Sequence, residues 1–183
     1  MKLLIASDLH GSAYYAKELQ LAVQTEAADK CVLLGDLLYH GPRNDLPREY
    51  DPKSVTKILN DMKDKLFCVR GNCDADVDAM VLDFPMLSDY ALILADGYTL
   101  FATHGHLYNE ENLPPLNKGD VLLNGHTHLR IAENRKDYYF VNPGSVSIPK
   151  DGYSGYTVFE NGVFTQKTFD GVAVATLSIK AKQ

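Results

Sequence analysis

Several short motifs in this chain consist of side chains that bind divalent metal ions. In chain order they read Asp8-Leu9-His10, Gly35-Asp36, Gly71-Asn72, Thr103-His104-Gly105-His106 and Gly125-His126-Thr127-His128. They supply enough oxygen and nitrogen to hold two divalent ions, with these candidate ligands: Asp8, His10, Asp36, Asn72, His104, His126 and His128. Two ions about 3.5–4 Å apart are common in enzymes that hydrolyse phosphate esters by in-line displacement. The motifs therefore predict hydrolysis of a phosphate ester.

Each motif follows a short apolar run, and strand ends of this kind can bring distant side chains together. Open sheets bind ligands in the crevice beyond the carboxyl ends of their strands. Asp36 follows the middle one of the three expected parallel strands, so its carboxylate is the natural bridge between two ions. One such motif alone more often marks a turn or a polar loop. A series of them, all at strand ends, is poorly explained by chance.

The first half of the chain alternates short apolar runs with helical patterns. We expect strands at residues 3–6, 31–34 and 66–69. Ser12 can cap a helix over residues 13–26, and Asp51 with Pro52 can begin a second helix after a loop at residues 38–50. This alternation is the βαβ signature of a largely parallel sheet.

The second half changes to hairpin patterns. Asp96-Gly97 separates the runs 91–95 and 98–103, and Asn161-Gly162 separates 156–160 and 163–168. Further strands are expected at residues 121–124, 130–133, 138–141 and 172–179. Parallel units followed by antiparallel hairpins predict an α/β sandwich of two packed sheets with helices outside.

The composition is that of a globular protein. Because no repeat, low-complexity stretch or linker divides the chain, we expect one domain over residues 1–183. The net charge of -6 argues weakly against a long basic track for nucleic acid. No run approaches the roughly 18 apolar residues of a membrane span. Cys31, Cys68 and Cys73 lack CxxC spacing, so we expect neither a disulfide framework nor a thiolate zinc site, which agrees with a cytoplasmic location.

The order of the motifs resembles that of the calcineurin-like metallophosphoesterases. The motifs of that family, D-x-H, G-D, G-N-x-D, H and G-H-x-H, follow one another along the chain in the same order. The strings Gly71-Asn72-Cys73-Asp74 and Asn142-Pro143-Gly144-Ser145-Val146 are similar to those of its small bacterial phosphodiesterases, and the resemblance covers residues 2–147. It implies a four-layer α/β/β/α sandwich of two mixed sheets flanked by helices.

The resemblance also implies a site for two divalent ions, often activated by manganese, with nickel, zinc, iron, cobalt or magnesium as alternatives. Carried over motif by motif, the first ion would be held by Asp8, His10, Asp36 and His128. The second ion would be held by Asp36, Asn72, His104 and His126. The glycines before Asp36, Asn72 and His126 are expected in tight turns that bring the backbone close to the ions.

Cys73 departs from the wider family pattern, which has a histidine there that is thought to protonate the leaving group or stabilise the transition state. A thiol can donate a proton, but it lacks the charge of an imidazolium. Cys73 is therefore one candidate for the catalytic acid. His106 is the other; it could reach the phosphate or could equally be a supporting loop histidine.

Other polar residues near the motifs have weaker assignments. Arg70 could face the phosphate, but a structural ion pair is favoured; His40 and Arg43 lie in a loop that could shape substrate binding, although solvated loop polarity is favoured for each. Asp74 is expected to orient its loop, and residues 142–145 to turn the chain behind the site.

Together these features predict hydrolysis of a small phosphodiester by a hydroxide that bridges the two metal ions. A phosphomonoesterase using the same site is the alternative within enzymes. A noncatalytic scaffold like the metallophosphoesterase-fold subunit of retromer is the alternative from another class, and a nuclease ranks lower. No stable nucleic-acid partner and no membrane association are expected, and a homo-oligomer, either dimer or tetramer, is left open.

Overall fold

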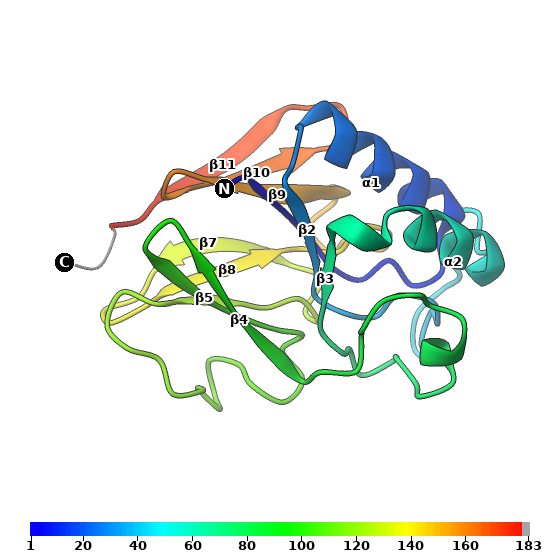
Figure 1. Cartoon of the computed structure of the whole chain (residues 1–183), viewed down its shortest axis with the longest axis horizontal. Helices are drawn as coiled ribbons and strands as arrows, with labels where there is room; N and C mark the ends of the chain where they lie inside the picture. Colours follow the sequence, from blue (N-terminus) through cyan, green and yellow to red (C-terminus); the bar gives the residue numbers. More distant parts are fainter. Residues whose placement is uncertain (181–183) are drawn as a thin grey trace.

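Two mixed β-sheets packed face to face form the centre of the computed structural model, which describes residues 1–180 (Figure 1). The six-stranded sheet has the order β11-β10-β9-β1-β2-β3. Its strands are β1 (Leu3–Ala6), β2 (Lys30–Leu33), β3 (Leu66–Cys68), β9 (Gly155–Glu160), β10 (Val163–Thr168) and β11 (Ala173–Ser178). β1, β2 and β3 are parallel, as predicted, while β9, β10 and β11 pair antiparallel.

The five-stranded sheet has the order β4-β5-β6-β8-β7. Its strands are β4 (Tyr90–Ala95), β5 (Tyr98–Thr103), β6 (Val121–Leu123), β7 (Arg130–Asn134) and β8 (Tyr139–Pro143). β5, β6 and β8 are parallel neighbours, and the hairpin partners β4 and β7 complete the two edges. The predicted hairpins at Asp96-Gly97 and Asn161-Gly162 are both present.

Two α-helices cover the outer face of the six-stranded sheet (Figure 1). In α1 (Ala13–Thr25), the N-cap Ser12 accepts a hydrogen bond from the N–H of Tyr15. In α2 (Pro52–Asp61), Asp51 caps the N–H of Ser54 in the same way. Both starts agree with the sequence prediction, because a side-chain oxygen satisfies a backbone donor that the first turn leaves unpaired. Two short 3₁₀ helices, η1 (Lys63–Lys65) and η2 (Asp78–Met80), flank β3.

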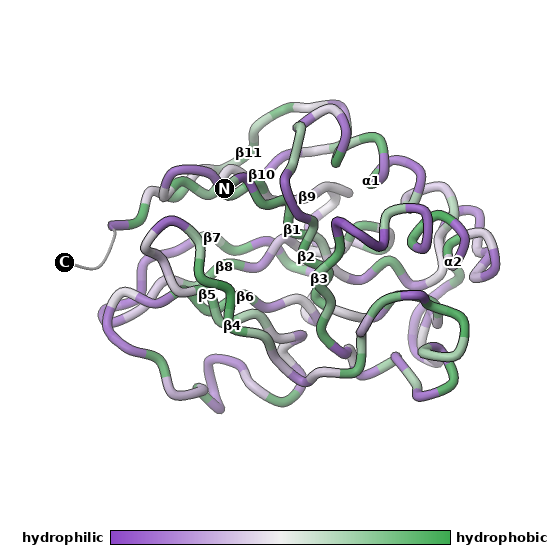
Figure 2. The backbone as a smooth tube through the Cα atoms, viewed as in Figure 1, coloured by the Kyte–Doolittle hydropathy of each residue, from purple (hydrophilic) through white to green (hydrophobic). Residues whose placement is uncertain are grey.

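The hydrophobic core consists of two layers separated by the six-stranded sheet. In β1, Leu4 and Ala6 pack toward the helices, while Leu3 and Ile5 pack toward the other sheet. Successive side chains of a strand point to opposite faces, so a run of apolar residues marks a strand buried on both sides. In Figure 2 the central strands are largely green, whereas purple is common on the helices and outer loops.

The outer face of the five-stranded sheet is covered by an extended segment, residues 104–120. Tyr108 and Leu116 of this segment pack on Phe101, Leu122 and Phe140. Pro114 and Pro115 prevent a regular helix there, and Asn109 closes a turn by accepting from two backbone N–H groups. The predicted α/β fold of two mixed sheets is therefore confirmed. Within residues 1–180 its fourth layer is this segment in place of an α-helix.

Within the described residues, no helix is long and apolar enough to cross a membrane.

Candidate metal centre

The predicted ligands come from separate strands and meet at one edge of the two sheets. Asp8 follows β1, Asp36 follows β2 and Asn72 follows β3. His104 comes directly after β5, and His126 and His128 follow β6. This is the edge where the parallel strands of each sheet end, so the carboxyl-end rule for open sheets holds here.

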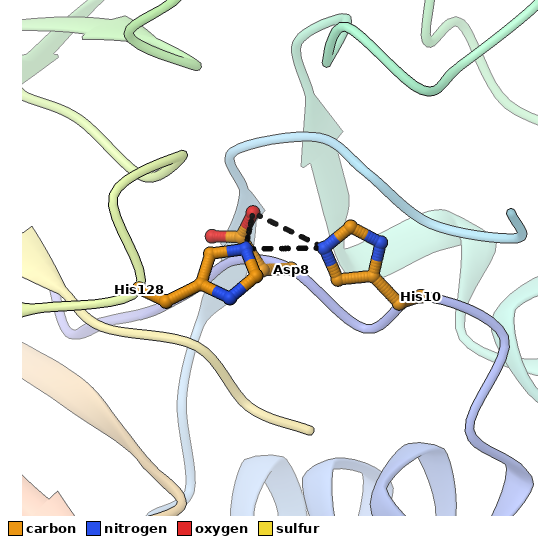
Figure 3. A group of neighbouring side chains, drawn as sticks. All are labelled: Asp8, His10 and His128. Carbon is orange, nitrogen blue, oxygen red and sulfur yellow. Dashed lines mark hydrogen bonds and ion pairs between the residues drawn. The ribbon is translucent and has the colours of Figure 1, made fainter. Parts of the chain in front are cut away.

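The first cluster contains Asp8, His10 and His128, whose side chains point toward one another (Figure 3). Asp8 Oδ1 lies 3.3 Å from His128 Nε2 and 3.6 Å from His10 Nε2. The two Nε2 atoms are 3.2 Å apart. All three residues are buried, so bulk water does not keep these polar atoms solvated. The cluster has the composition and spacing of a metal site.

Backbone carbonyls fix the orientation of the clustered histidines. His10 Nδ1 lies 2.8 Å from the Tyr39 carbonyl oxygen, and His128 Nδ1 lies 2.9 Å from that of Ile148. A carbonyl oxygen only accepts, so each Nδ1 carries the proton. In the neutral imidazole, Nε2 then keeps a lone pair that points into the cluster. Metal-binding histidines are held in this way in many proteins.

The surroundings of Asp8 Oδ1 indicate whether a cation would fit this cluster. Asp8 Oδ1 is buried and accepts no hydrogen bond within residues 1–180. Burial opposes ionisation, yet His10 and His128 hold the pKa of Asp8 below its usual range, so the group is a carboxylate. This buried carboxylate oxygen accepts no hydrogen bond among the described residues and faces the Nε2 atoms of His10 and His128, an arrangement of donors that a cation could bind. The donor set therefore suits a divalent ion.

Asp36 connects the first cluster to a second one. Its Oδ2 lies 3.7 Å from His10 Nε2 and 3.4 Å from His104 Nε2. Its Oδ1 accepts the backbone N–H of Cys73 at 2.8 Å, which fixes the carboxylate in this orientation. Asn72 Oδ1 lies 3.0 Å from His104 Nε2. Asp36 thus occupies the position expected for a carboxylate shared by two ions.

His104 belongs to the second cluster, and His126 lies next to it. His104 Nδ1 lies 2.6 Å from the carbonyl oxygen of Leu34, so its Nε2 faces Asp36 and Asn72. Burial lowers the pKa of His104, but the carboxylates of Asp36 and Asp8 raise it overall to about 9. A proton and a divalent cation therefore compete for the same Nε2 lone pair. The His126 ring lies beside it, with the two ring centroids 5.1 Å apart.

Strained backbone is concentrated at the predicted ligands. Positive φ angles occur at Asp8 (61°), His10 (48°), Asp36 (57°), His126 (66°) and His128 (61°). Residues other than glycine rarely adopt this left-handed conformation, and it persists only where the surroundings enforce it. The motif strings predicted the residues but not this backbone conformation, which turns the side chains inward.

Hydrogen bonds from neighbouring loops hold this strained backbone. The Asp8 carbonyl oxygen accepts from the hydroxyls of Ser145 and Ser147, both at 2.9 Å. The Asn142 side chain donates to the Gly125 carbonyl oxygen at 2.7 Å. The segment expected behind the site therefore fastens the Asp8 loop and the loop of His126.

Asp74 ties together the loops that carry Asp36 and Asn72. Its Oδ2 accepts the N–H of Asp36 at 2.8 Å and that of Gly71 at 2.7 Å, and its Oδ1 accepts the N–H of Leu37 at 2.8 Å. The carboxylate is buried and turned toward these backbone donors. This geometry agrees with the predicted loop-orienting role of Asp74.

Gly71 allows the backbone to approach Asp36 closely. A Cβ atom at this position would lie 2.1 Å from Asp36 Oδ1 and 2.3 Å from the Asp36 backbone nitrogen. No side chain can be accommodated at such distances, so any other residue would displace the Asp36 carboxylate. The same holds before His126, where a Cβ at Gly125 would lie 1.9 Å from Ser7 Oγ.

A pocket of about 580 Å³ opens on the predicted ligands. It is lined by His10, Asp36, Gly41, Pro42, Arg43, Asn44, Asn72, Cys73, His126, Thr127, His128, Leu129 and Lys150. Pockets of this size accommodate organic molecules considerably larger than a phosphate group. The pocket therefore has room for a phosphate ester with substituents.

The two candidate acids occupy different places relative to this pocket. Cys73 lines it, and its Sγ lies in one group with ligand atoms of His10 and Asp36. Burial, together with the charge of Asp36, raises the pKa of Cys73 to about 12, so the thiol keeps its proton. His106 lies beside the His104 ring, 5.4 Å between centroids, and does not line the pocket. Burial lowers its pKa, so its imidazole is neutral.

Of the residues with weaker assignments, one lines the pocket and two do not. Arg43 lines the pocket, whereas His40 does not; the His40 ring packs edge-on against Tyr39 and Tyr50. Arg70 does not line the pocket either. Sequence reasoning missed Lys150, whose backbone N–H donates to the His128 carbonyl oxygen at 3.0 Å. The available signal was its position five residues after the segment, residues 142–145, that was expected to turn behind the site.

Comparison with known proteins identifies related chains over nearly the whole length. The family model of the calcineurin-like phosphoesterase superfamily domain matches residues 1–161. Phosphodiesterase YfcE of Escherichia coli (strain K12) is 47% identical over 166 residues, which cover 90% of each chain. Probable metallophosphoesterase YsnB of Bacillus subtilis (strain 168) is 27% identical over 185 residues, covering 93% of this chain and 91% of that one.

Solved structures agree with these sequence relationships. The structure of YfcE, described as a phosphoesterase from E. coli, superposes with a TM-score of 0.96 at 44% identity, covering 98% of this chain and 100% of that one. Vps29 from Entamoeba histolytica superposes with a TM-score of 0.65 at 17% identity, covering 98% and 100%. The second likeness extends to the fold alone.

Proposed function

Because the chain belongs to the calcineurin-like phosphoesterase superfamily, we propose that it is a metal-dependent hydrolase of small phosphodiesters. The observation that carries this proposal is the position of Asp36, whose Oδ2 lies near His10 of one cluster and His104 of the other. A carboxylate between two groups of nitrogen and oxygen donors is what a two-metal site requires.

We assign the first ion to Asp8, His10, Asp36 and His128, and the second to Asp36, Asn72, His104 and His126. The grouping of Asp8 with His10 and His128, and the approach of His104 to Asp36 and Asn72, support this division. When bound, the ions supply an activated water as the nucleophile and neutralise charge on the phosphoryl oxygens. Our proposed metal is manganese, which the family resemblance implies; the mixed oxygen and imidazole set is also compatible with iron, cobalt, nickel or zinc.

The residues around the proposed metal site hold the ligands in place and supply a proton. Backbone carbonyls hold His10, His104 and His128 with Nε2 inward, so the ligands need no reorganisation when the metal binds. Cys73 lines the pocket as a protonated thiol and can donate that proton to the departing oxygen. A protonated thiol is a poor nucleophile, so covalent catalysis by Cys73 is not part of the proposal.

We predict that diesters are hydrolysed with a higher kcat/KM than monoesters. A monoester carries an additional negative charge on the reacting phosphate, and the cations that line the pocket, Arg43 and Lys150, are exposed loop residues outside the ligand set. The measurement compares bis(p-nitrophenyl) phosphate with p-nitrophenyl phosphate, using protein stripped of metal and reloaded with Mn, Ni, Zn or Mg.

Three outcomes of this comparison bear on the alternatives. Metal-dependent turnover with the diester preferred would support the proposal. A large preference for monoesters across several leaving groups would establish the phosphomonoesterase alternative instead. No turnover with any metal, despite full metal occupancy, would favour the scaffold alternative.

A further inference from the structure

The lining of the pocket includes two cationic residues, Arg43 and Lys150, that are not among the predicted ligands. Arg43 comes from the loop after Asp36, and Lys150 from the segment after β8. Asp36, a predicted ligand, supplies the single acidic side chain among the described residues that line the pocket. Apart from the predicted ligands, the charged residues of the lining are therefore both basic, although the whole chain has a net charge of -6.

Six Lys and Arg side chains have carboxylate partners among the described residues, and Arg43 and Lys150 are not among them. Arg130 pairs with Asp151, Arg135 with Glu110, and Lys167 with Glu26. Within residues 1–180, neither Arg43 nor Lys150 forms an ion pair. Their charges are thus available to an anionic ligand in the pocket.

The backbone that carries each cation is fixed to the site. At Gly41 (φ 80°) a Cβ would lie 3.1 Å from Cys73 Sγ, so the turn that precedes Arg43 packs against Cys73. The Asn44 side chain donates to the His40 carbonyl oxygen at 2.8 Å and closes that turn. Lys150 is tied to the loop of His128 through its own backbone N–H. The backbone that carries each cation is therefore held beside the ligand loops.

Apolar side chains line the same pocket as these charges and the predicted ligands. Pro42 and Leu129 line the same pocket, and Leu129 is 43% exposed. Such surface suits the organic part of an ester, while Arg and Lys suit phosphate or carboxylate oxygens. The pocket of about 580 Å³ is large enough to hold both parts of one substrate.

We propose that Arg43 and Lys150 select phosphodiesters that carry a second anionic group, a phosphate or a carboxylate, on the substituent that does not leave. This inference rests on the proposed function, because it concerns the substrate of the same site. Arg43 and Lys150 would bind that second anion, and the scissile phosphate would lie at the predicted ligands.

The test uses three alkyl p-nitrophenyl phosphates that share one leaving group and differ in the end of the alkyl tail. The tail ends in a hydroxyl, a carboxylate or a phosphate. We expect kcat/KM to be about 10-fold higher for at least one anionic tail than for the hydroxyl tail, through a lower KM, and to decline as salt is added. The two anionic tails distinguish carboxylate from phosphate recognition.

The double variant Arg43→Gln and Lys150→Gln should reduce the ratio of anionic to neutral kcat/KM to about 1. Lys57→Gln, which removes an exposed charge on α2, is the matched control and should leave the ratio unchanged. A ratio near 1 in the unaltered protein, or a ratio that survives the double variant, would overturn the inference. The hydroxyl-tail diester separates the two failures, because its hydrolysis tests the proposed function alone.

Discussion

Replacing Asp36 with alanine is expected to abolish turnover and remove most of the bound metal. The carboxylate lies near histidines of both clusters, so its loss weakens the sites of both ions at once. We expect kcat/KM for an activated diester to fall by at least about 10³-fold, which corresponds to roughly 4 kcal/mol of lost transition-state stabilisation. Elemental analysis of the purified variant should find well under two equivalents of metal.

Companion variants show whether the effect is specific to a shared ligand. His126→Ala and His128→Ala should each weaken the binding of a different ion, so each should lose less metal than Asp36→Ala. Asp45→Ala removes an exposed carboxylate from the loop after Asp36 and should change neither metal content nor turnover. Two full equivalents of metal in an active Asp36→Ala protein would contradict the bridging assignment.

Replacing Cys73 with histidine is expected to raise turnover mainly for esters with poor leaving groups. The pKa of about 12 keeps the thiol protonated, but a thiol lacks the positive charge that an imidazolium places near the departing oxygen. The gain could reach about 10²-fold for an alcohol leaving group, which is the low end for positioned acid catalysis. Activated phenolic esters need little protonation and should change less.

The competing hypothesis is that His106 protonates the leaving group. Paired variants distinguish it from the hypothesis that Cys73 does so. If His106 were the acid, His106→Ala would be severe and Cys73→His would be neutral or harmful. Cys73→Ser should change activated-ester turnover little, because it removes no predicted metal ligand. Each variant is measured on matched good and poor leaving groups at equal metal content. A uniform effect of Cys73→His on both groups would count against our assignment.

The sheets and the convergence of the ligands could be predicted because both follow from local patterns. The apolar runs before Asp8, Asp36 and Asn72 became the parallel strands β1, β2 and β3. Parallel strands share an edge where their carboxyl ends meet, so the polar residues after them had to come together. The two hairpins followed from Asp-Gly and Asn-Gly turns, whose conformational preference is local.

Features that depend on long-range contacts could not be read from the sequence. The strained backbone of Asp8 is held by Ser145 and Ser147, which are distant from it in the chain. Lys150 became part of the pocket wall because its backbone pairs with His128. The cover of the five-stranded sheet was expected to be helical, but in that segment Pro114 and Pro115 favour an extended path.

The position of His106 also illustrates this limit. The Thr-His-Gly-His string predicts two histidines near the site, but the string alone does not say which one faces the substrate. In the fold, His104 turns its Nε2 toward Asp36, whereas His106 lies beside the His104 ring and outside the pocket lining. Its catalytic role stays a prediction that the leaving-group experiment decides.

Anomalous diffraction from manganese-loaded crystals tests the central claim most directly. We predict two peaks about 3.5–4 Å apart on either side of the Asp36 carboxylate. One peak should lie among Asp8, His10 and His128, and the other should lie near Asn72, His104 and His126. A single peak, or peaks away from Asp36, in a protein that hydrolyses diesters at full rate would contradict the two-metal account.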